Sequence, residues 1–309
     1  MLGAIKGKLA FAKFIRIIGV IEPFAVGVYA LISHEFLLII LGIAISIFLL
    51  LWGLHIRNSA MNQYGQSFVL PMARQVFPGA EFTYIEKHLD LDRFHNLGLI
   101  TRDKYEKVTN HLVSNDEHEL ENFSLLCEHT ESDSDGDSRT VTTYSGTVVS
   151  YKTPTGIQGV VRVIASGQFK ILFIKKETTF VRGKAPIAPW KIETGSVAFD
   201  DNFEVYASDQ HLGYYVLNAY VIEKLQAFRA KYGTFALTIT SDYLYAAFDH
   251  IDKFISVPET ISSIGENPFE DAKRDLNELI ESLNDISFAI SKSTQREKII
   301  RYLRNSLKV

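Results

Sequence analysis

Few residues of this sequence have the types and the spacing that chemistry requires. His88 and His95 lie seven positions apart with Asp92 between them, so one helical face could carry all three side chains. Two histidines and a carboxylate suit zinc or iron, but neither an HExxH motif nor a comparable pattern accompanies them. We therefore interpret the three residues as partly exposed side chains on a helix surface, and we predict no metal site.

Cys127 is the only cysteine, which excludes a disulfide framework and a multi-cysteine metal site. A nucleophilic cysteine needs an activating base, and His129 lies two positions further along, on the same face of a predicted strand. That strand, 122–129, is largely apolar. This setting favours a buried cysteine with a structural role over a catalytic one.

The segment around Asp209 is the third candidate for a special site. Asp209, Gln210, His211 and Tyr214 follow a predicted strand and precede a helical run. Asp209 or Ser208 would cap that run by accepting hydrogen bonds from backbone N–H groups of the next turn. The alternative is a ligand or partner surface that the four residues form together.

Three acidic residues, Asp133, Asp135 and Asp137, alternate in a loop between two strand-like runs. An EF-hand places its glycine after the third acidic position and a glutamate six residues later, whereas Gly136 precedes Asp137 here. The loop is therefore predicted to be solvated. Because no phosphate-binding loop, nucleophile elbow or dinucleotide fingerprint occurs, the sequence predicts no catalytic residue, no cofactor and a protein that is not an enzyme.

The charge is distributed unevenly along the chain. A net charge of −4 argues against a nucleic-acid-binding protein that depends on bulk positive charge. Residues 1–57 hold five basic and two acidic side chains, a net of +3, and residues 292–309 hold six and one, a net of +5. Residues 58–291 hold 21 basic and 33 acidic side chains, a net of −12. A basic start and a basic tail thus flank an acidic body.

The strongest signal in the sequence is its apolar start. Phe36 to Leu54 is a run of nineteen residues without a charge. As a helix it would span about 28 Å, close to the thickness of about 30 Å of a bilayer core. Trp52 lies near its end, where an amphipathic ring suits the membrane interface. Residues 1–57 are therefore predicted to be a membrane anchor.

A second apolar run, 17–32, precedes the first and contains Glu22 and Pro23. Proline kinks a helix, and a carboxyl in lipid is costly unless it lies at the interface, takes a proton or pairs. We predict that helices over about 15–32 and 36–55 form a transmembrane hairpin. One span plus a helix lying in the interface is the alternative.

Basic residues outside the two runs set the predicted orientation. The turn at 33–35 contains no Lys or Arg, and the cytoplasmic side of a membrane protein carries an excess of both. Both ends of the hairpin should then face the cytoplasm, which makes the protein multi-pass and leaves most of the chain cytoplasmic. The basic residues concerned are Lys6, Lys8, Lys13, Arg16, Arg57 and Arg74.

Beyond the anchor, the sequence predicts three parts. Residues 58–119 read as a helical connector, 120–257 as a mostly antiparallel α+β domain, and 266–309 as amphipathic C-terminal helices. The domain is assigned because the apolar period changes to two near residue 120. Its predicted strands are 122–129, 141–151, 160–165, 169–175, 178–181, 192–199, 203–206, 235–240 and 243–248, and its predicted helix is 218–232.

The C-terminal part is predicted to contain two helices, separated by a break at Ser291–Thr294. The second helix is basic, and its charges have two interpretations. Either the helix packs on the body with its charges in water, or it lies on the anionic inner leaflet beside the hairpin. The residues of this predicted membrane contact are Arg296, Lys298, Arg301, Arg304 and Lys308.

Residues 191–225 carry a recognisable pattern of apolar, aromatic and acidic positions. Its members are Glu193, Phe199, Phe203, Val205, Tyr206, Ser208, Asp209, Gln210, Tyr214, Tyr215, Val216, Leu217 and Leu225. This pattern resembles the DUF3137 family of bacterial membrane proteins of unknown function. The closing run 235–248 and the paired apolar segments also fit, and the resemblance covers roughly residues 80–255.

The sequence differs from the family pattern at one place, and the resemblance says little about function. Gly213-Tyr214 stands where the family usually has Ala-Arg before its tyrosine, so any role of that arginine does not carry over. The resemblance implies a domain anchored in the bacterial cytoplasmic membrane. It implies no reaction, cofactor or catalytic residue.

Together these features predict a membrane-anchored cytoplasmic interaction or sensing protein. Its expected partners are the lipid bilayer and a second membrane protein, whose span would pair with Glu22. Two alternatives stay open: a membrane-associated enzyme acting on a lipid-linked or protein substrate, and an accessory subunit of a membrane complex. A deep pocket with converging titratable groups would favour the enzyme.

Overall fold

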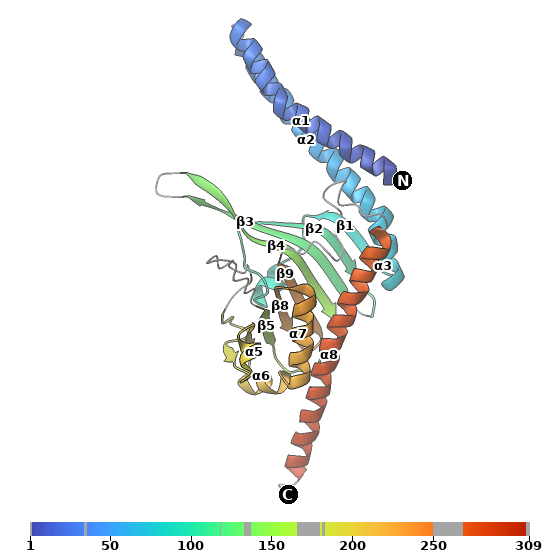
Figure 1. The fold of residues 1–309 in the computed structure, drawn as a ribbon, viewed down its shortest axis with the longest axis vertical. Coiled ribbons are helices and arrows are strands. Elements are labelled where there is room, and N and C mark those ends of the chain that lie inside the picture. The colour runs from blue at the N-terminus through green and yellow to red at the C-terminus, as the bar shows by residue number, and fades with distance from the viewer. Residues whose placement is uncertain are drawn as a thin grey trace.

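The computed structural model describes residues 2–33, 36–117, 119–132, 137–165, 180, 183–249 and 268–306 (Figure 1). The helices are α1 (Leu2–Ser33), α2 (Phe36–Tyr64), α3 (Leu70–Val76), α4 (Asp92–Asn96), α5 (Val197–Asp200), α6 (Gln210–Val216), α7 (Ala219–Tyr232) and α8 (Pro268–Ser306), with a π-helical turn η1 (Gly65–Val69) after α2. The strands are β1 (Glu81–Glu86), β2 (Tyr105–Ser114), β3 (Leu120–Ser132), β4 (Ser138–Lys152), β5 (Val161–Ala165), β6 (Trp190–Ile192), β7 (Phe203–Ala207), β8 (Phe235–Ile239) and β9 (Tyr243–Asp249).

The described strands form one sheet in the order β1-β2-β3-β4-β9-β8-β5-β7-β6. Every neighbouring pair is antiparallel. The chain first lays down β1 to β4 side by side, and the β8–β9 hairpin then joins them to the second half of the sheet. The prediction of an α+β fold with a mostly antiparallel sheet is therefore confirmed.

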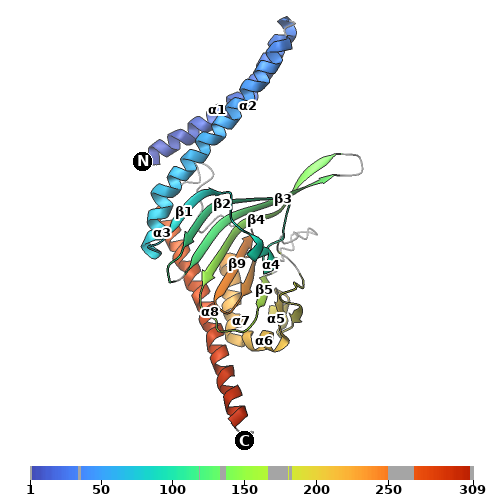
Figure 2. The same cartoon turned by 180° about the vertical axis from the view of Figure 1, so that it is seen from behind.

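Helices α6, α7 and α8 lie on one face of this sheet, and α4 lies on the other (Figures 1 and 2). On the first face, the apolar stripe of α7 (Val221, Leu225 and Phe228) is buried in the same cluster as Leu237 of β8. On the second face, Phe94 of α4 is buried among strand residues of a separate cluster. Because both faces are covered, β5 and β8 are buried at every position.

The two ends of α7 follow directly from the sequence. Asn218 accepts hydrogen bonds from the backbone N–H groups of Tyr220 and Val221 at 2.9 and 3.1 Å, as an N-cap should. Gly233 ends the helix with a φ of +78°, a conformation that glycine adopts without strain. Both assignments agree with the predicted helix 218–232.

Helices α1 and α2 lie side by side in opposite directions and project from the sheet as an apolar arm (Figure 1). Pro23 has no N–H, so the carbonyl of Gly19 loses its helical donor, and Ser46 of α2 donates its hydroxyl to that carbonyl instead. Glycines allow the close contact, since a Cβ on Gly42 would lie 2.8 Å from Val26. One helix of the described residues, Leu37–Val76, is long and apolar enough to cross a membrane.

The base of the arm belongs to the core of the sheet domain. Ile5 and Leu9 of α1 are buried in the same apolar cluster as Met61 and Tyr64 of α2, and this cluster continues into the sheet. Lys8 adds a hydrogen bond of 2.7 Å from its Nζ to Gln63 Oε1. The predicted boundary after residue 57 therefore does not separate two cores.

The predicted helical connector over 58–119 is wrong beyond Val76. The Pro78-Gly79 turn is followed by β1, in which Phe82 and Tyr84 point into the core while Glu81 faces solvent. Strand β2 then pairs with both β1 and β3. Over so few residues, the spacing of apolar side chains is compatible with a helix and with a strand. The segment forms a strand because it pairs with β3.

The predicted strand 192–199 is also shorter than expected. Strand β6 ends at Ile192, because the Asp200 carboxylate accepts hydrogen bonds of 3.1 Å from the backbone N–H groups of Thr194 and Gly195 and closes a turn. Helix α5 begins at Val197 and occupies the last three residues of the predicted strand. The predicted strand 169–175 lies outside the described residues, and of the predicted strand 178–181 only Phe180 is described, as a buried residue in a bend.

The predicted break at Ser291–Thr294 is absent, and α8 is continuous. Ser293 donates a hydrogen bond of 3.0 Å to the Tyr215 carbonyl, and Thr294 donates one of 3.1 Å to the Ile290 carbonyl. These polar side chains find partners in a packed helix and do not end it. The helix thus runs along the sheet and past its lower edge (Figure 1).

The end of α8 lies at the opposite end of the molecule from the tip of the arm (Figures 1 and 2). A membrane contact of this tail beside α1 and α2 does not agree with that arrangement, because the sheet domain lies between them. Arg296 is exposed. The side chains of Lys298, Arg301 and Arg304, and all of Lys308, lie outside the described part of the chain.

Candidate functional site: a charged network at the base of a β-ribbon

Strands β3 and β4 continue beyond the rest of the sheet as a two-stranded ribbon (Figure 1). The pairing of β9 with β4 ends at Gly146, and the pairing of β2 with β3 ends at Glu128. Among the described residues, 129–132 and 138–141 therefore pair only with one another. An isolated two-stranded ribbon is only marginally stable in water, so side chains at its base must help to hold it.

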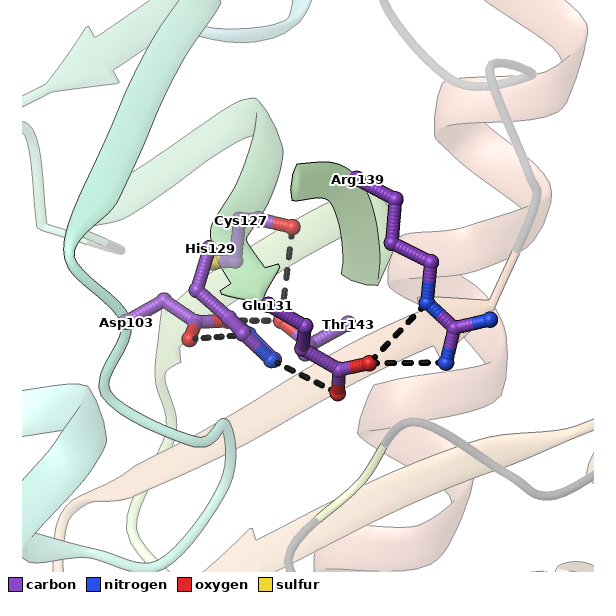
Figure 3. Close-up of polar contacts among 6 residues, drawn as sticks. All are labelled: Asp103, Cys127, His129, Glu131, Arg139 and Thr143. Atoms are coloured by element: carbon purple, nitrogen blue, oxygen red, sulfur yellow. Dashed lines mark hydrogen bonds and ion pairs between the residues drawn. The ribbon is translucent and has the colours of Figure 1, made fainter. Parts of the chain in front are cut away.

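His129 is the centre of the polar contacts at this base (Figure 3). Its Nδ1 lies 3.1 Å from Asp103 Oδ1 and its Nε2 lies 3.2 Å from Glu131 Oε1. The other oxygen of Glu131 accepts hydrogen bonds of 3.2 and 2.8 Å from Nε and Nη2 of Arg139. Thr143 donates its hydroxyl to Asp103. The network joins the segment before β2 to both strands of the ribbon.

The charges of the network alternate in sign. The contact with Glu131, followed by that with Asp103, raises the pKa of His129 above its ordinary value of 6.5. The guanidinium of Arg139, followed by His129, holds the pKa of Glu131 below its ordinary value. Both ring nitrogens of His129 contact carboxylates, so the cationic form of the imidazole is favoured and neither nitrogen is left open to a substrate.

Cys127 lies beside the network but does not share its chemistry. Its side chain is fully buried in the apolar cluster on the second face of the sheet. Burial, with smaller contributions from the charges of Glu106 and Asp103, raises the pKa of the thiol to about 12. A thiol of this kind stays protonated at neutral pH and is a poor nucleophile. The structural role predicted for Cys127 agrees with this environment.

Two further histidine–carboxylate pairs join α4 to β2 and β2 to β3. Nε2 of His95 lies 3.1 Å from Glu106 Oε1, and Nε2 of His111 lies 3.1 Å from Glu121 Oε1. Arg93 also contacts Glu121. These pairs were not predicted from the sequence, since each brings together residues ten or more positions apart. No local pattern in the sequence signals them, because β2 is mostly polar.

The suggested trio of His88, Asp92 and His95 does not converge. Asp92 pairs with Arg102, whereas the carboxylate beside His95 is Glu106. The side chain of His88 is exposed. Among the described residues, no group of three metal-ligating side chains lies close enough to hold an ion. Asp133 and Asp135 lie outside the described part, so the acidic loop is not addressed.

The segment around Asp209 forms the start of α6, as expected. Asp209 is the N-cap, and its Oδ1 accepts a hydrogen bond of 3.1 Å from the Leu212 N–H. The side chains of Gln210, His211 and Tyr214 are exposed. Gly213 lies against β6, where a Cβ would come within 2.4 Å of Ile192. This close approach explains why glycine rather than alanine occupies the position.

Asp209→Ala is expected to lower the free energy of unfolding by about 1 kcal/mol, because the Leu212 N–H loses its acceptor. Chemical denaturation followed by circular dichroism measures the change. Asp209→Asn is the matched control, since asparagine caps about as well as aspartate. Equal losses for both variants would contradict the capping role.

The imidazole of His129 is expected to titrate above pH 6.5, and Glu131→Gln is expected to lower that pKa, because Glu131 is its strongest partner. A raised pKa in the folded state means that the contribution of His129 to stability is complete below pH 6.5 and is lost as the pH rises through the folded pKa. NMR titration of the imidazole gives the pKa. The protection of amides 129–132 relative to their intrinsic exchange rates should fall over the same pH range; unchanged protection would contradict the fastening role.

Comparison with known proteins finds a family resemblance over the second half of the chain. Residues 142–291 match the family model described as "Protein of unknown function (DUF3137)". This match confirms the DUF3137 resemblance over these residues. The matched region runs from β4 to α8 and contains Asp209 and its exposed neighbours.

One solved structure is similar, the mycobacterial trehalose monomycolate transport factor A, TtfA. The sequence identity is 10%, the match covers 73% of this chain and 96% of that chain, and the TM-score is 0.34. A score of this size does not establish a common fold. None of the curated proteins matches the chain.

Proposed function

We propose that this protein is a membrane-tethered interaction protein without catalytic activity. In this proposal α1 and α2 cross the bacterial cytoplasmic membrane as a hairpin, and the sheet domain lies on the cytoplasmic side. The ribbon of β3 and β4 and the exposed start of α6 are the surfaces that meet partners.

The observation that carries the proposal is the exposed apolar surface of the arm. Most of the exposed large hydrophobic side chains among the described residues lie between Phe11 and Leu54. Soluble proteins seldom expose apolar patches of more than a few hundred Å². Both helices are long enough to reach across a bilayer core. Lipid acyl chains would therefore cover their exposed apolar surface.

Charge supports the orientation. Lys13 and Arg16 precede the apolar part of α1, and Arg57 follows that of α2, so all three lie at the end of the arm that joins the sheet domain. Basic residues of this kind favour the cytoplasmic side. The acidic body would then extend away from an anionic inner leaflet.

The network supports a role in binding over one in catalysis. His129 is committed to Asp103 and Glu131, and the thiol of Cys127 is buried and protonated. The contacts of His129 fasten the ribbon in place, and neither side chain presents a reactive atom. Tyr214 is 56% exposed, and exposed aromatic side chains are typical of protein-binding surfaces.

Cysteine labelling in intact cells tests the topology. The native Cys127 is buried, so an added cysteine can be labelled without replacing it. In Ile32→Cys, a membrane-impermeant maleimide is expected to react from outside; in Ser59→Cys it should react only after permeabilisation. The unsubstituted chain is the control. Reaction of both positions from the same side would overturn the hairpin.

A role as a subunit of a membrane complex is the second candidate, and Glu22 is the observation that favours it. Glu22 lines an apolar groove of about 350 Å³ between α1 and α2, together with Val26, Leu41 and Ile45. Its Oε2 is buried and has no hydrogen-bond partner among the described residues. A carboxyl in lipid requires a partner or a proton, and a Lys or Arg of another span would supply one.

A designed transmembrane peptide tests this second candidate. The probe is a leucine–alanine helix with one central lysine, and the same helix with a central leucine is its control. Energy transfer in bilayers is expected to show tighter binding of the lysine peptide to the native chain, lost in Glu22→Leu and retained in Glu22→Asp. Equal binding of both peptides would exclude the pairing.

A further inference from the structure

A second groove lies at the base of the apolar arm. It has a volume of about 310 Å³, and its lining residues are Lys13, Arg16, Ile17, Val20 and Ile21 of α1 and Leu50 of α2. The two basic residues, Lys13 and Arg16, come first along α1, and the other lining residues are apolar. Lys13 and Ile21 are eight positions apart, so the groove follows α1 for about 12 Å.

The two cations at the mouth of the groove are free to bind an anion. Lys13 and Arg16 are exposed, and neither pairs with a carboxylate among the described residues. The stem of Arg16 lies across α2 at Gly53, where a Cβ would come within 2.6 Å of Arg16 Cγ. Glycine at this position therefore lets the arginine lie against the second helix, beside Lys13.

Along the groove, basic side chains are followed by apolar ones, as the charged headgroup of a phospholipid is followed by its acyl chains. The charged end precedes the predicted apolar run that begins at Ile17, and Leu50 lies four residues before the end of the other run. The groove thus starts at the predicted membrane interface and continues into the bilayer core. An anionic headgroup at Lys13 and Arg16 would leave an acyl chain along the apolar wall.

We propose that this groove is a binding site for an anionic phospholipid. The phosphate of the headgroup contacts Lys13 and Arg16, and one acyl chain packs on Ile17, Val20 and Leu50. This inference rests on the proposed crossing of the membrane by α1 and α2. It adds a specific ligand to the tether, because a zwitterionic lipid carries the same acyl chains without the net negative charge that the two cations attract.

Native mass spectrometry of the full chain in a mild detergent tests the site. The probes are phosphatidylglycerol and phosphatidylcholine with identical acyl chains, and glycerol phosphate as the free headgroup. Each basic residue near an anionic surface contributes roughly five-fold in affinity, so the native chain should prefer phosphatidylglycerol by about thirty-fold. Lys13→Gln with Arg16→Gln should remove this preference.

The matched control is Lys6→Gln with Lys8→Gln, which removes the same charge from the same helix outside the groove and should keep the preference. Arg16→Lys should retain most of it, which shows that the loss in the double variant is not a folding defect. Equal binding of both lipids, equal loss in the control pair, or binding of glycerol phosphate as tight as that of the lipid would overturn the site. Ile32→Cys labelling of the same variants reports the topology separately, so failure of the tether and failure of the lipid site are distinguishable.

Discussion

Replacing Arg162 by methionine is expected to lower the free energy of unfolding by about 4 kcal/mol. Arg162 lies in β5 and is 1% exposed, which makes it one of the largest fully buried side chains of the described residues. Its Nη1 donates to the Gly183 carbonyl at 3.1 Å, and its Nη2 donates to the Gly98 carbonyl. Methionine has a similar length but no donor, so two carbonyls would lose their partner.

The position of Arg162 makes this loss affect the whole second face of the sheet. Gly98 follows α4 with a φ of +65°, and a Cβ there would lie 2.9 Å from the guanidinium carbon. The arginine therefore ties the segment after α4 and the segment around Gly183 to the centre of the sheet. Burial lowers the pKa of the guanidinium, but an arginine side chain remains charged at neutral pH.

Chemical denaturation of the full chain, followed by circular dichroism, measures the effect. Lys184→Met is the matched control, because it removes an exposed cation next to Gly183 and should change the free energy by less than about 0.5 kcal/mol. If Arg162→Met unfolds within 1 kcal/mol of the native chain, as an ordinary surface change would, the guanidinium does not hold the two segments.

Gly146→Ala is expected to destabilise the protein by about 3 kcal/mol. Gly146 lies in β4 opposite Asp249, at the last pair that joins β4 to β9. A Cβ at this position would lie 1.9 Å from the Phe248 carbonyl oxygen and 3.0 Å from the Tyr144 hydroxyl. Backbone cannot give way as a flexible side chain can, so the pairing of the two strands must open.

The same substitution should release the ribbon. The Tyr144 hydroxyl lies 3.1 Å from the Phe248 carbonyl oxygen and 3.0 Å from that of Thr147, so it holds the place where β4 leaves the sheet. Hydrogen exchange at residues 138–145 should therefore accelerate more than exchange in β8. Gly7→Ala is the control, since a Cβ there meets nothing within 4 Å and alanine favours a helix. Uniform acceleration throughout the chain would contradict a local release.

Several parts of the candidate sites were predictable because their causes are local. The cap at Asp209 depends only on a polar side chain before a helical run, and the hydrogen bond to Leu212 N–H confirms it. The apolar setting of Cys127 was also visible in its strand. The His129 network was not, because it depends on Asp103, which lies 26 positions away and reaches the ribbon only through the packing of the segment before β2.

The sequence by itself determined the apolar helices of the arm, the α+β class and the β8–β9 hairpin, since each is set by composition or by spacing within a few turns. Only the tertiary structure decided that β1 and β2 extend the sheet, that α8 is unbroken, and that Ile5 and Leu9 join the core of the domain. These outcomes depend on pairing and burial between distant segments. A short apolar segment has no intrinsic preference strong enough to settle them before its neighbours are in place.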